Sequence, residues 1–338
     1  MSAASSTPFI SIIVPSYNQG KYIEKTILSV LNQSFTNWEL IIQDACSKDE
    51  TAEVCEKYVN TDPRIRFYQE KDKGFADAVN KALSKATGRI AAIQSSDDYY
   101  AYAEVFSEVA DHFSKNEQLI IVTADFKMID SDDQIIDSPV RKNEDGFISP
   151  ISVFTLKNHF PQSSTFFKTE RARQIGGLHP EVDMVADTDF WIRMSNYSPI
   201  GSKSIFKVNG VWSYAIMHPD QRSADTSKFF LARLVMYSEM LNESRLEVPY
   251  EQRLQTFHIS MVDAFHYLLF KKRDVKDIIQ LHKKVYHKDI PISWSLKSLL
   301  FKLPFFHQLY FSNFKDHDSG VKLDLPRAGT ALWFRKKS

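Results

Sequence analysis

The chain has 338 residues, of which 43% are hydrophobic and 25% charged, a balance typical of a globular protein rather than a disordered or collagen-like one. Lys and Arg together number 42, as do Asp and Glu, so no net field favours a polyanion and we expect no nucleic-acid partner. Only Cys46 and Cys55 are present, which argues against a disulfide framework and fits a reducing compartment.

The N-terminal part of the chain alternates strands with helices. A nearly unbroken apolar run at residues 9–17 predicts a strand covered on both faces, and residues 38–45, 64–70 and 89–96 read as three further strands. Apolar residues spaced by four, acidic first turns and a terminating Gly88 predict helices between them, at 21–33, 48–59 and 74–88. Because strands and helices alternate with short links, we expect the α/β class, with a mostly parallel, doubly wound sheet and helices on both faces.

The pattern changes after residue 118. Residues 118–137 predict two strands that form a hairpin through the turn "DSDDQ". Farther along, we expect a short strand and a helix within 158–181, and further helices at 185–198, 229–243 and 255–273.

Polar segments follow the four predicted strands: "PSYNQG", "QDACS", "EKDKG" and "SSDD". Ligands of open α/β sheets bind at the carboxyl ends of the strands, so these segments are candidate ligand contacts. No G-x-G-x-x-G follows the first strand, and no G-x-x-x-x-G-K-[ST] occurs. A bound phosphate would therefore need neutralisation by something other than a glycine-rich loop.

An acidic pair, Asp97 and Asp98, ends the stretch "IAAIQSSDDYY" after Ser95 and Ser96. These side chains could cap a helix beginning near Tyr99. They could instead hold Mg²⁺ or Mn²⁺, which prefers oxygen ligands and would relieve the repulsion between the two carboxylates. A cap needs one side chain and this stretch offers four, which favours the metal site while leaving the cap open.

The other strand ends carry single candidates. Tyr17 could present a flat surface to a nucleotide base or be a core aromatic, and Asp44 could accept from a base N–H or stabilise a turn. Lys73 could meet a phosphate or be solvated, and Asp77 could reach a sugar or be a surface carboxylate. Together these four residues indicate a nucleotide site at the strand ends.

Four segments together resemble the family 2 glycosyltransferases of the GT-A fold, in order over residues 9–223. They are "VPSYNQGKYIEKTILSVLNQSFTNWELIIQDACSKDET", "EKDKGFADAVNKALSKATGRIAAIQSSDDYY", "FPQSSTFFKTERARQIGGLHPEVDMVADTDFWIRM" and "MHPDQRS". The resemblance implies an inverting transfer of a hexose or N-acetylhexosamine from a nucleotide diphosphate sugar to a hydroxyl of a glycan or lipid-linked glycan. UDP is the expected carrier, because Asp44 could accept from a pyrimidine N–H, although thymine presents the same N–H. It also implies a GT-A catalytic domain at 1–222, with a nucleotide-binding half at 9–118 and an acceptor half at 119–222, followed by a C-terminal helical extension at 223–338.

The same resemblance implies roles for the nucleotide-contacting residues. The base would lie against Pro15, Tyr17 and Asn18, with Asp44 accepting from it. Lys73 and Asp77 match a basic residue and a carboxylate that the family places near the donor. The nucleotide contacts implied are thus Pro15, Tyr17, Asn18, Asp44, Lys73, Asp77 and Asp97.

The family's Asp-x-Asp metal motif aligns with Ser96, Asp97 and Asp98, so a serine departs from the pattern. Asp98 would then be the direct ligand of Mn²⁺ or Mg²⁺, with Asp97 contacting ribose or a metal-bound water. His218 would complete the metal shell or touch the diphosphate.

The resemblance implies that Asp187 is the general base, with Ala186 where members often have glutamate. Asp189 is expected to bond backbone N–H groups of the first helical turn. Gln162 and Ser163 would lie near the acceptor or donor sugar.

Two other functions stay open at this point. A nucleotidyltransferase also uses a doubly wound sheet and a metal, although "PSYNQGKY" is not the glycine-rich basic loop it normally needs. A binding or scaffold protein that lost turnover is the other, because Ser96 and Ala186 depart from the family pattern.

The C-terminal part is basic and rich in large apolar residues. Residues 285–312 could lie on a membrane surface, or pack as a helical cover or an oligomer contact. The chain does not open on a basic segment followed by an apolar one, and no uncharged run reaches the roughly 18 residues of a membrane span. We therefore expect a cytoplasmic protein, with the inner membrane face as the alternative location.

Overall fold

The computed structural model describes residues 7–137, 145–158, 160–197, 203–218 and 226–270. All of them belong to one compact unit that spans Met1–Ile278. No helix among them combines the length and the apolar character needed to cross a bilayer. The predicted membrane or oligomer contact at 285–312 lies outside the described residues and stays a prediction.

The first half of the sheet is parallel, as predicted. Its strand order is β3-β2-β1-β4, and β1 starts in register with both neighbours, because Ile10 pairs with Trp38 and with Ile90. The strands are β1 (Ile10–Ser16), β2 (Trp38–Asp44), β3 (Ile65–Gln69) and β4 (Ile90–Ile93). The helices between them are α1 (Ile23–Leu31), α2 (Thr51–Val59) and α3 (Phe75–Lys85).

Beyond β4 the sheet is mixed. Strand β9 (Thr165–Lys168) lies between β4 and β6 (Ile121–Ile129) and runs antiparallel to both. β10 (Ile205–Ile216) then runs parallel to β6, and β5 (Asp98–Tyr100) pairs antiparallel with β10. The predicted hairpin forms between β6 and β7 (Ile135–Asp137), and β8 (Gly146–Phe147) pairs with β10.

The prediction of a helix starting near Tyr99 is wrong. Residues 98–100 form β5, and the next helix, α4 (Val105–Lys115), begins later, with Glu104 at its N-cap. Tyr99 pairs with Tyr214 of β10, and Tyr100 packs its ring 4.9 Å from that of Phe106. Aromatic side chains fit a half-buried strand, so packing overrides the capping potential of the serines and carboxylates before them.

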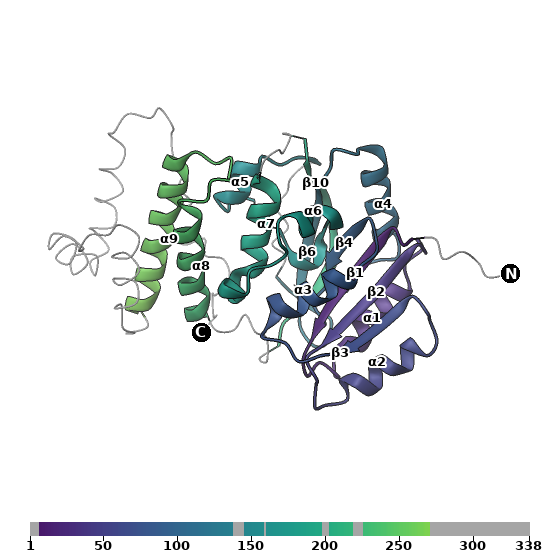
Figure 1. The fold of residues 1–338 in the computed structure, drawn as a ribbon. Coiled ribbons are helices and arrows are strands. Elements are labelled where there is room, and N and C mark those ends of the chain that lie inside the picture. Colours follow the sequence, from purple (N-terminus) through teal and green to yellow (C-terminus); the bar gives the residue numbers. More distant parts are fainter. Residues whose placement is uncertain (1–6, 138–144, 159, 198–202, 219–225, 271–338) are drawn as a thin grey trace. The chain divides into compact units, whose positions relative to one another are not determined.

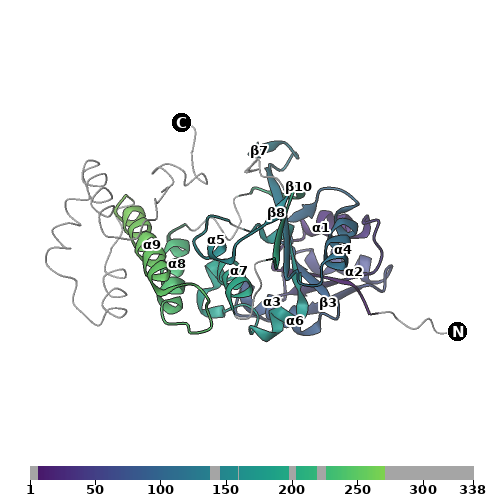
Figure 2. The ribbon, with the colours of Figure 1, turned by 90° about the horizontal axis from the view of Figure 1, so that it is seen from above.

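Helices cover both faces of the sheet (Figure 2). α1, α2 and α4 bury their apolar stripes against one face, in a cluster that includes Ile12, Val14 and Leu40. α3 packs on β1 and β2 from the other face, with α6 (Thr169–Gln174) beside it. This two-sided cover explains why β1 reads as a nearly unbroken apolar run.

The remaining helices follow β9 and β10. α7 (Ala186–Asn196) joins the sheet through its Phe190 and Trp191 rings, which pack against Phe167. α8 (Thr226–Met240) and α9 (Tyr250–Phe270) lie side by side (Figure 1), and α8 also packs on η2 (Pro180–Val185). The domain boundary predicted at 222/223 stays a prediction. The other elements are η1 (Gln162–Ser164) and α5 (Pro150–Phe154).

Candidate active site

The loops after β1 and β2 are tied together at the strand ends. The Asn18 N–H donates to Ser47 Oγ at 2.8 Å, and Asn18 Oδ1 accepts from the Lys48 N–H at 2.9 Å. Asn18 adopts a left-handed φ of 52°, which asparagine tolerates better than most residues. Tyr17, beside it, is 58% exposed. Its ring is therefore exposed on the surface rather than part of the core, and Pro15, near the end of β1, is half-buried.

Asp44 is fully buried and stabilises a turn. Its Oδ2 accepts from the Ser47 N–H at 2.8 Å, and its Oδ1 accepts from Ser47 Oγ at 2.5 Å. The turn-stabilising alternative is thus observed. Because a carboxylate offers about four acceptor positions, the nucleotide contact expected for Asp44 stays a prediction.

Lys73 and Asp77 lie at the start of α3. Asp77 Oδ2 accepts from the Lys73 N–H at 3.0 Å and from Lys81 Nζ at 2.9 Å. The hydrogen bond from Lys81 lowers the pKa of the Asp77 carboxyl. Asp77 therefore holds the loop, while the Lys73 side chain is exposed at the strand ends.

Asp183, which the sequence did not single out, links this loop to the segment before α7. Its Oδ1 accepts from the Ala76 N–H at 2.8 Å, so η2 caps α3 from 107 residues away. Gly74 permits the contact, because its φ is 127° and a Cβ there would lie 3.0 Å from Asp183 Oδ2. The cap fixes η2, and so the start of the helix that carries Asp187.

The two carboxylates of the acidic pair point to different partners. Asp97 Oδ2 lies 2.9 Å from His218 Nε2. Asp98 is only 8% exposed. Burial and the neighbouring charge of Asp97 raise the pKa of the Asp98 carboxyl well above its usual value, against hydrogen bonds from Ser163, Ser95 and a backbone N–H.

The structure brings the predicted sugar-contacting residues to this pair. Gln162 Nε2 donates to Ser95 Oγ at 3.1 Å, and the hydroxyl of Ser163 bonds Asp98. Thr26 of α1 anchors the backbone of this segment, because its hydroxyl donates to the Asp98 carbonyl at 2.7 Å. Residues from α1, η1 and the end of β10 thus meet at one point.

Tyr22 and Gln94 are candidate site residues that the sequence reasoning missed. The Tyr22 ring stacks on His218 with centroids 4.3 Å apart and planes inclined by 19°. Gln94, the first residue after β4, is fully buried, and neither polar atom of its amide has a hydrogen-bond partner among the described residues. A polar glutamine ending an apolar run was the available signal for Gln94. Tyr22 offered none, because its role depends on a contact across 196 residues.

Asp187 lies on another element, α7. It lies half-buried in the first turn of α7, and its contact is a long hydrogen bond of 3.5 Å from Thr188 Oγ1. Within the described ranges, no hydrogen bond or ion pair joins it to Asp97, Asp98 or His218.

Asp189 differs from its predicted role. It lies in the first turn, as expected, but its carboxylate bonds the Arg193 guanidinium at 2.5 Å and His179 Nδ1 at 3.2 Å rather than backbone N–H groups. The reason is burial. The Asp189 carboxylate is only 3% exposed, and a buried charge needs a partner of opposite charge rather than the N–H groups of a helix end.

The acidic pair can be tested for its fit to a divalent cation. The described part of the chain holds no group of three or more His, Cys, Asp and Glu side chains already arranged as ligands. Even so, the groups that bond Asp98 carry no charge, and His218 Nδ1 is buried and has no hydrogen-bond partner among the described residues. Two adjacent carboxyl groups beside an imidazole, one of them buried without a cationic partner among the groups that bond it, are a donor set that Mn²⁺ or Mg²⁺ fits.

A doubly wound sheet with polar strand ends and an acidic pair beyond β4 defines a class of fold. The chain superposes on S. aureus TarS 1–349 in complex with UDP-GlcNAc with a TM-score of 0.64 and 18% identity, over 82% of this chain and 80% of that one. It also superposes on a mannosyltransferase from Pyrobaculum calidifontis, solved with GDP-Man and Mn²⁺, with a TM-score of 0.55 and 15% identity, over 90% and 83% of the two chains. The fold is the GT-A fold.

Residues 11–173, just under half of the chain, match the model of glycosyl transferase family 2. Among curated relatives, the putative teichuronic acid biosynthesis glycosyltransferase TuaG of Bacillus subtilis is 49% identical over 92 residues, 27% of this chain and 36% of TuaG. The chondroitin synthase of Escherichia coli is 26% identical over 221 residues, 64% of this chain and 30% of the synthase. The chain thus spans about a third of the length of these relatives.

Proposed function

We propose that the protein is an inverting glycosyltransferase that moves a hexose or N-acetylhexosamine from a nucleotide diphosphate sugar to a hydroxyl of a glycan or lipid-linked glycan. The observation that carries the proposal is the cluster of Asp97, Asp98, His218 and Ser163 at the strand ends of a family 2 domain. UDP is the proposed carrier, which the UDP-GlcNAc bound to TarS supports.

The chain's own residues would hold the donor at both ends. The exposed Tyr17 ring would carry the base, beside Asn18 and Asp44, and the Lys73 ammonium would approach the diphosphate. A divalent metal, when bound, would offset the charge that grows on the leaving diphosphate. Asp98 is its proposed ligand, with His218 and Asp97 beside it.

Asp187 is the proposed general base. A carboxylate removes the proton from the acceptor hydroxyl as that oxygen attacks the anomeric carbon, so the new bond forms on the face opposite the leaving group. Gln162 and Ser163, which contact the Ser95–Asp98 segment, would lie next to the transferred sugar.

A melting screen of nucleotide sugars with and without Mn²⁺ tests the proposal. We expect UDP with Mn²⁺ to raise the melting temperature of the wild-type chain, and Asp98→Ala to lose the metal-dependent part of that shift, since one of two carboxylates is removed. If UDP with Mn²⁺ stabilises Asp98→Ala as much as its parent, Asp98 is not a ligand. The surface variant Asp111→Asn is the control, because the Asp111 side chain is exposed on α4 and pairs with Lys115. Metal-dependent release of UDP from the donor separates an enzyme from a scaffold, which releases none.

Tyr22→Leu should weaken binding of UDP with Mn²⁺ by about 2- to 10-fold, because a stacked ring pair is worth about 0.5–1.5 kcal/mol and His218 would lose its orientation. Tyr22→Phe keeps the ring and should bind like the wild type. The readouts are titration calorimetry and the NMR signal of the His218 ring. Equal binding by the Leu and wild-type proteins would show that Tyr22 does not position His218.

A further inference from the structure

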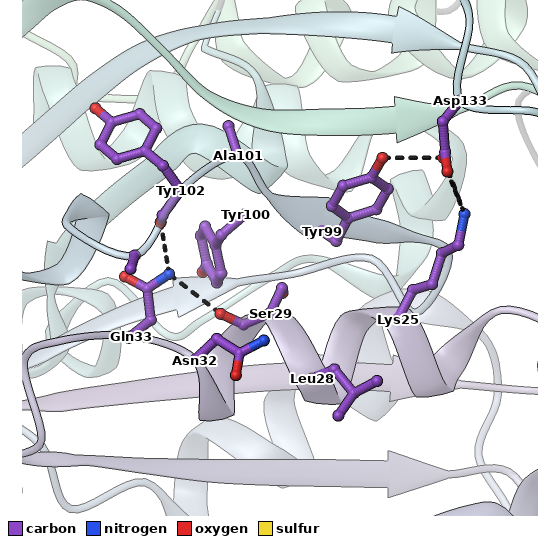
Figure 3. Close-up of a pocket in the computed structure, with 11 residues that line it drawn as sticks. Lys25, Leu28, Ser29, Asn32, Gln33, Tyr99, Tyr100, Ala101, Tyr102 and Asp133 are labelled. Atoms are coloured by element: carbon purple, nitrogen blue, oxygen red, sulfur yellow. Dashed lines mark hydrogen bonds and ion pairs between the residues drawn. The ribbon is translucent and has the colours of Figure 1, made fainter.

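A pocket of about 360 Å³ opens between α1 and the segment that leaves β5 (Figure 3). α1 supplies one wall with Leu28 and Asn32, and Tyr99 and Tyr102 lie across from them. The pocket shares α1 and β5 with the candidate active site but none of its proposed residues. Asp98, the β5 residue of that site, bonds Ser163 and Ser95 and does not line the pocket.

At one end of the pocket, the polar side chains bond one another. Lys25 Nζ lies 2.9 Å from both carboxylate oxygens of Asp133, and the Tyr99 hydroxyl donates to Asp133 Oδ1 at 3.0 Å. Both members of the ion pair remain about half exposed, at 47% and 50%. The cation and anion cancel, so this end offers donors and acceptors without a net charge that would select an ionic ligand.

The other end is apolar with spare hydrogen-bonding capacity. Leu28 and Tyr102 are 40% and 36% exposed, unusually high for large hydrophobic side chains. The exposed Asn32 side chain lines the pocket, and so does the buried Tyr100 hydroxyl, which has no hydrogen-bond partner among the described residues. Aromatic rings next to unused donors and acceptors suit a ligand that is apolar on its faces and polar at its edges.

We propose that this pocket, a site separate from the candidate active site, binds an uncharged glycan chain. A sugar ring presents C–H groups to an aromatic or aliphatic surface while its hydroxyls bond groups such as the Asn32 amide and the Asp133 carboxylate. The preference for a glycan over another amphipathic ligand rests on the proposed function. Binding itself requires neither donor nor turnover, so the two proposals fail separately.

The test titrates the full chain with chitotetraose, cellotetraose and an anionic hyaluronan tetrasaccharide, without nucleotide. We expect an uncharged tetrasaccharide to bind more tightly than the anionic one, and Leu28→Glu to weaken that binding by about tenfold, since a carboxylate would be desolvated against the ligand. Ile151→Glu is the matched control: Ile151 is 37% exposed on α5, outside the pocket, and that variant should bind like the wild type.

Asn32→Ala provides a second variant at a solvent-exposed helix end, where loss of folding is not expected. It should weaken glycan binding several-fold and leave the melting shift with UDP and Mn²⁺ unchanged. The proposal is overturned if neither uncharged tetrasaccharide binds the wild type, if the anionic one binds more tightly, or if both pocket variants bind like the wild type. If the wild-type chain binds an uncharged tetrasaccharide but not UDP, the proposed function is contradicted while the glycan-site proposal stands.

Discussion

Asp187→Asn is expected to lower the turnover of sugar transfer by about 10²- to 10⁴-fold while leaving nucleotide binding nearly unchanged. The amide cannot take the proton from the acceptor hydroxyl. No hydrogen bond or ion pair joins Asp187 to Asp97, Asp98 or His218 within the described residues, so the donor site should not change. The measurement is the rate of UDP release with donor, acceptor and Mn²⁺, together with the melting shift that UDP and Mn²⁺ produce.

Glu181→Gln is the matched control for this prediction. Glu181 is an exposed carboxylate in η2, six residues before Asp187, and its loss should leave turnover at the wild-type level. Wild-type turnover in Asp187→Asn would remove Asp187 from the reaction. A loss of UDP binding in that variant would assign it to the donor site instead.

The parallel half of the fold could be predicted because its signals are local. β1 is buried on both faces, so its sequence is a nearly continuous apolar run, and α1 carries Ile23 and Ile27 on a single buried stripe. Parallel strands also place their carboxyl ends along one edge. That geometry is why the polar segments after β1 to β4 could be grouped before any contact was known, whereas His218 joined Asp98 only through the resemblance to the family.

The mixed half could not be predicted, because its pairings are non-local. β9 inserts between β4 and β6, and β5 finds its partner in β10, more than 110 residues later. No period of apolar residues encodes such a choice; it depends on how tertiary packing closes the sheet. For the same reason, the different partners of Asp97 and Asp98 could not be predicted. Asp97 contacts His218 because β10 ends beside β5.

Asp189→Asn should lower the free energy of unfolding by about 3–5 kcal/mol, the usual cost of removing one member of a buried ion pair. Arg193 is 1% exposed, and its guanidinium also donates to the carbonyls of Ile175 and Gly177. Those carbonyls cannot neutralise its charge, so the variant would leave a buried cation without an anion. Urea unfolding monitored by tryptophan fluorescence measures the change, because Trp191 lies in the same helix.

The pH dependence of that loss has a definite sign. Burial alone would raise the pKa of the Asp189 carboxyl, but the hydrogen bond from His179 and the charge and hydrogen bond of Arg193 together lower it. A carboxyl with a lowered folded pKa contributes its stability above the unfolded value of about 3.9 and loses it as the pH falls through the folded pKa. The gap between wild type and Asp189→Asn should therefore be full at neutral pH and narrow only below about pH 4.

Asp111→Asn provides the comparison, because Asp111 and Lys115 are also spaced i,i+4 but are 54% and 74% exposed. Water screens that pair, so its loss should change the unfolding free energy by less than about 0.5 kcal/mol at any pH. Equal effects of the two substitutions would mean that the Asp189–Arg193 pair is solvated. The carboxylate would then be expected to bond the backbone of the first helical turn, as the sequence alone suggested.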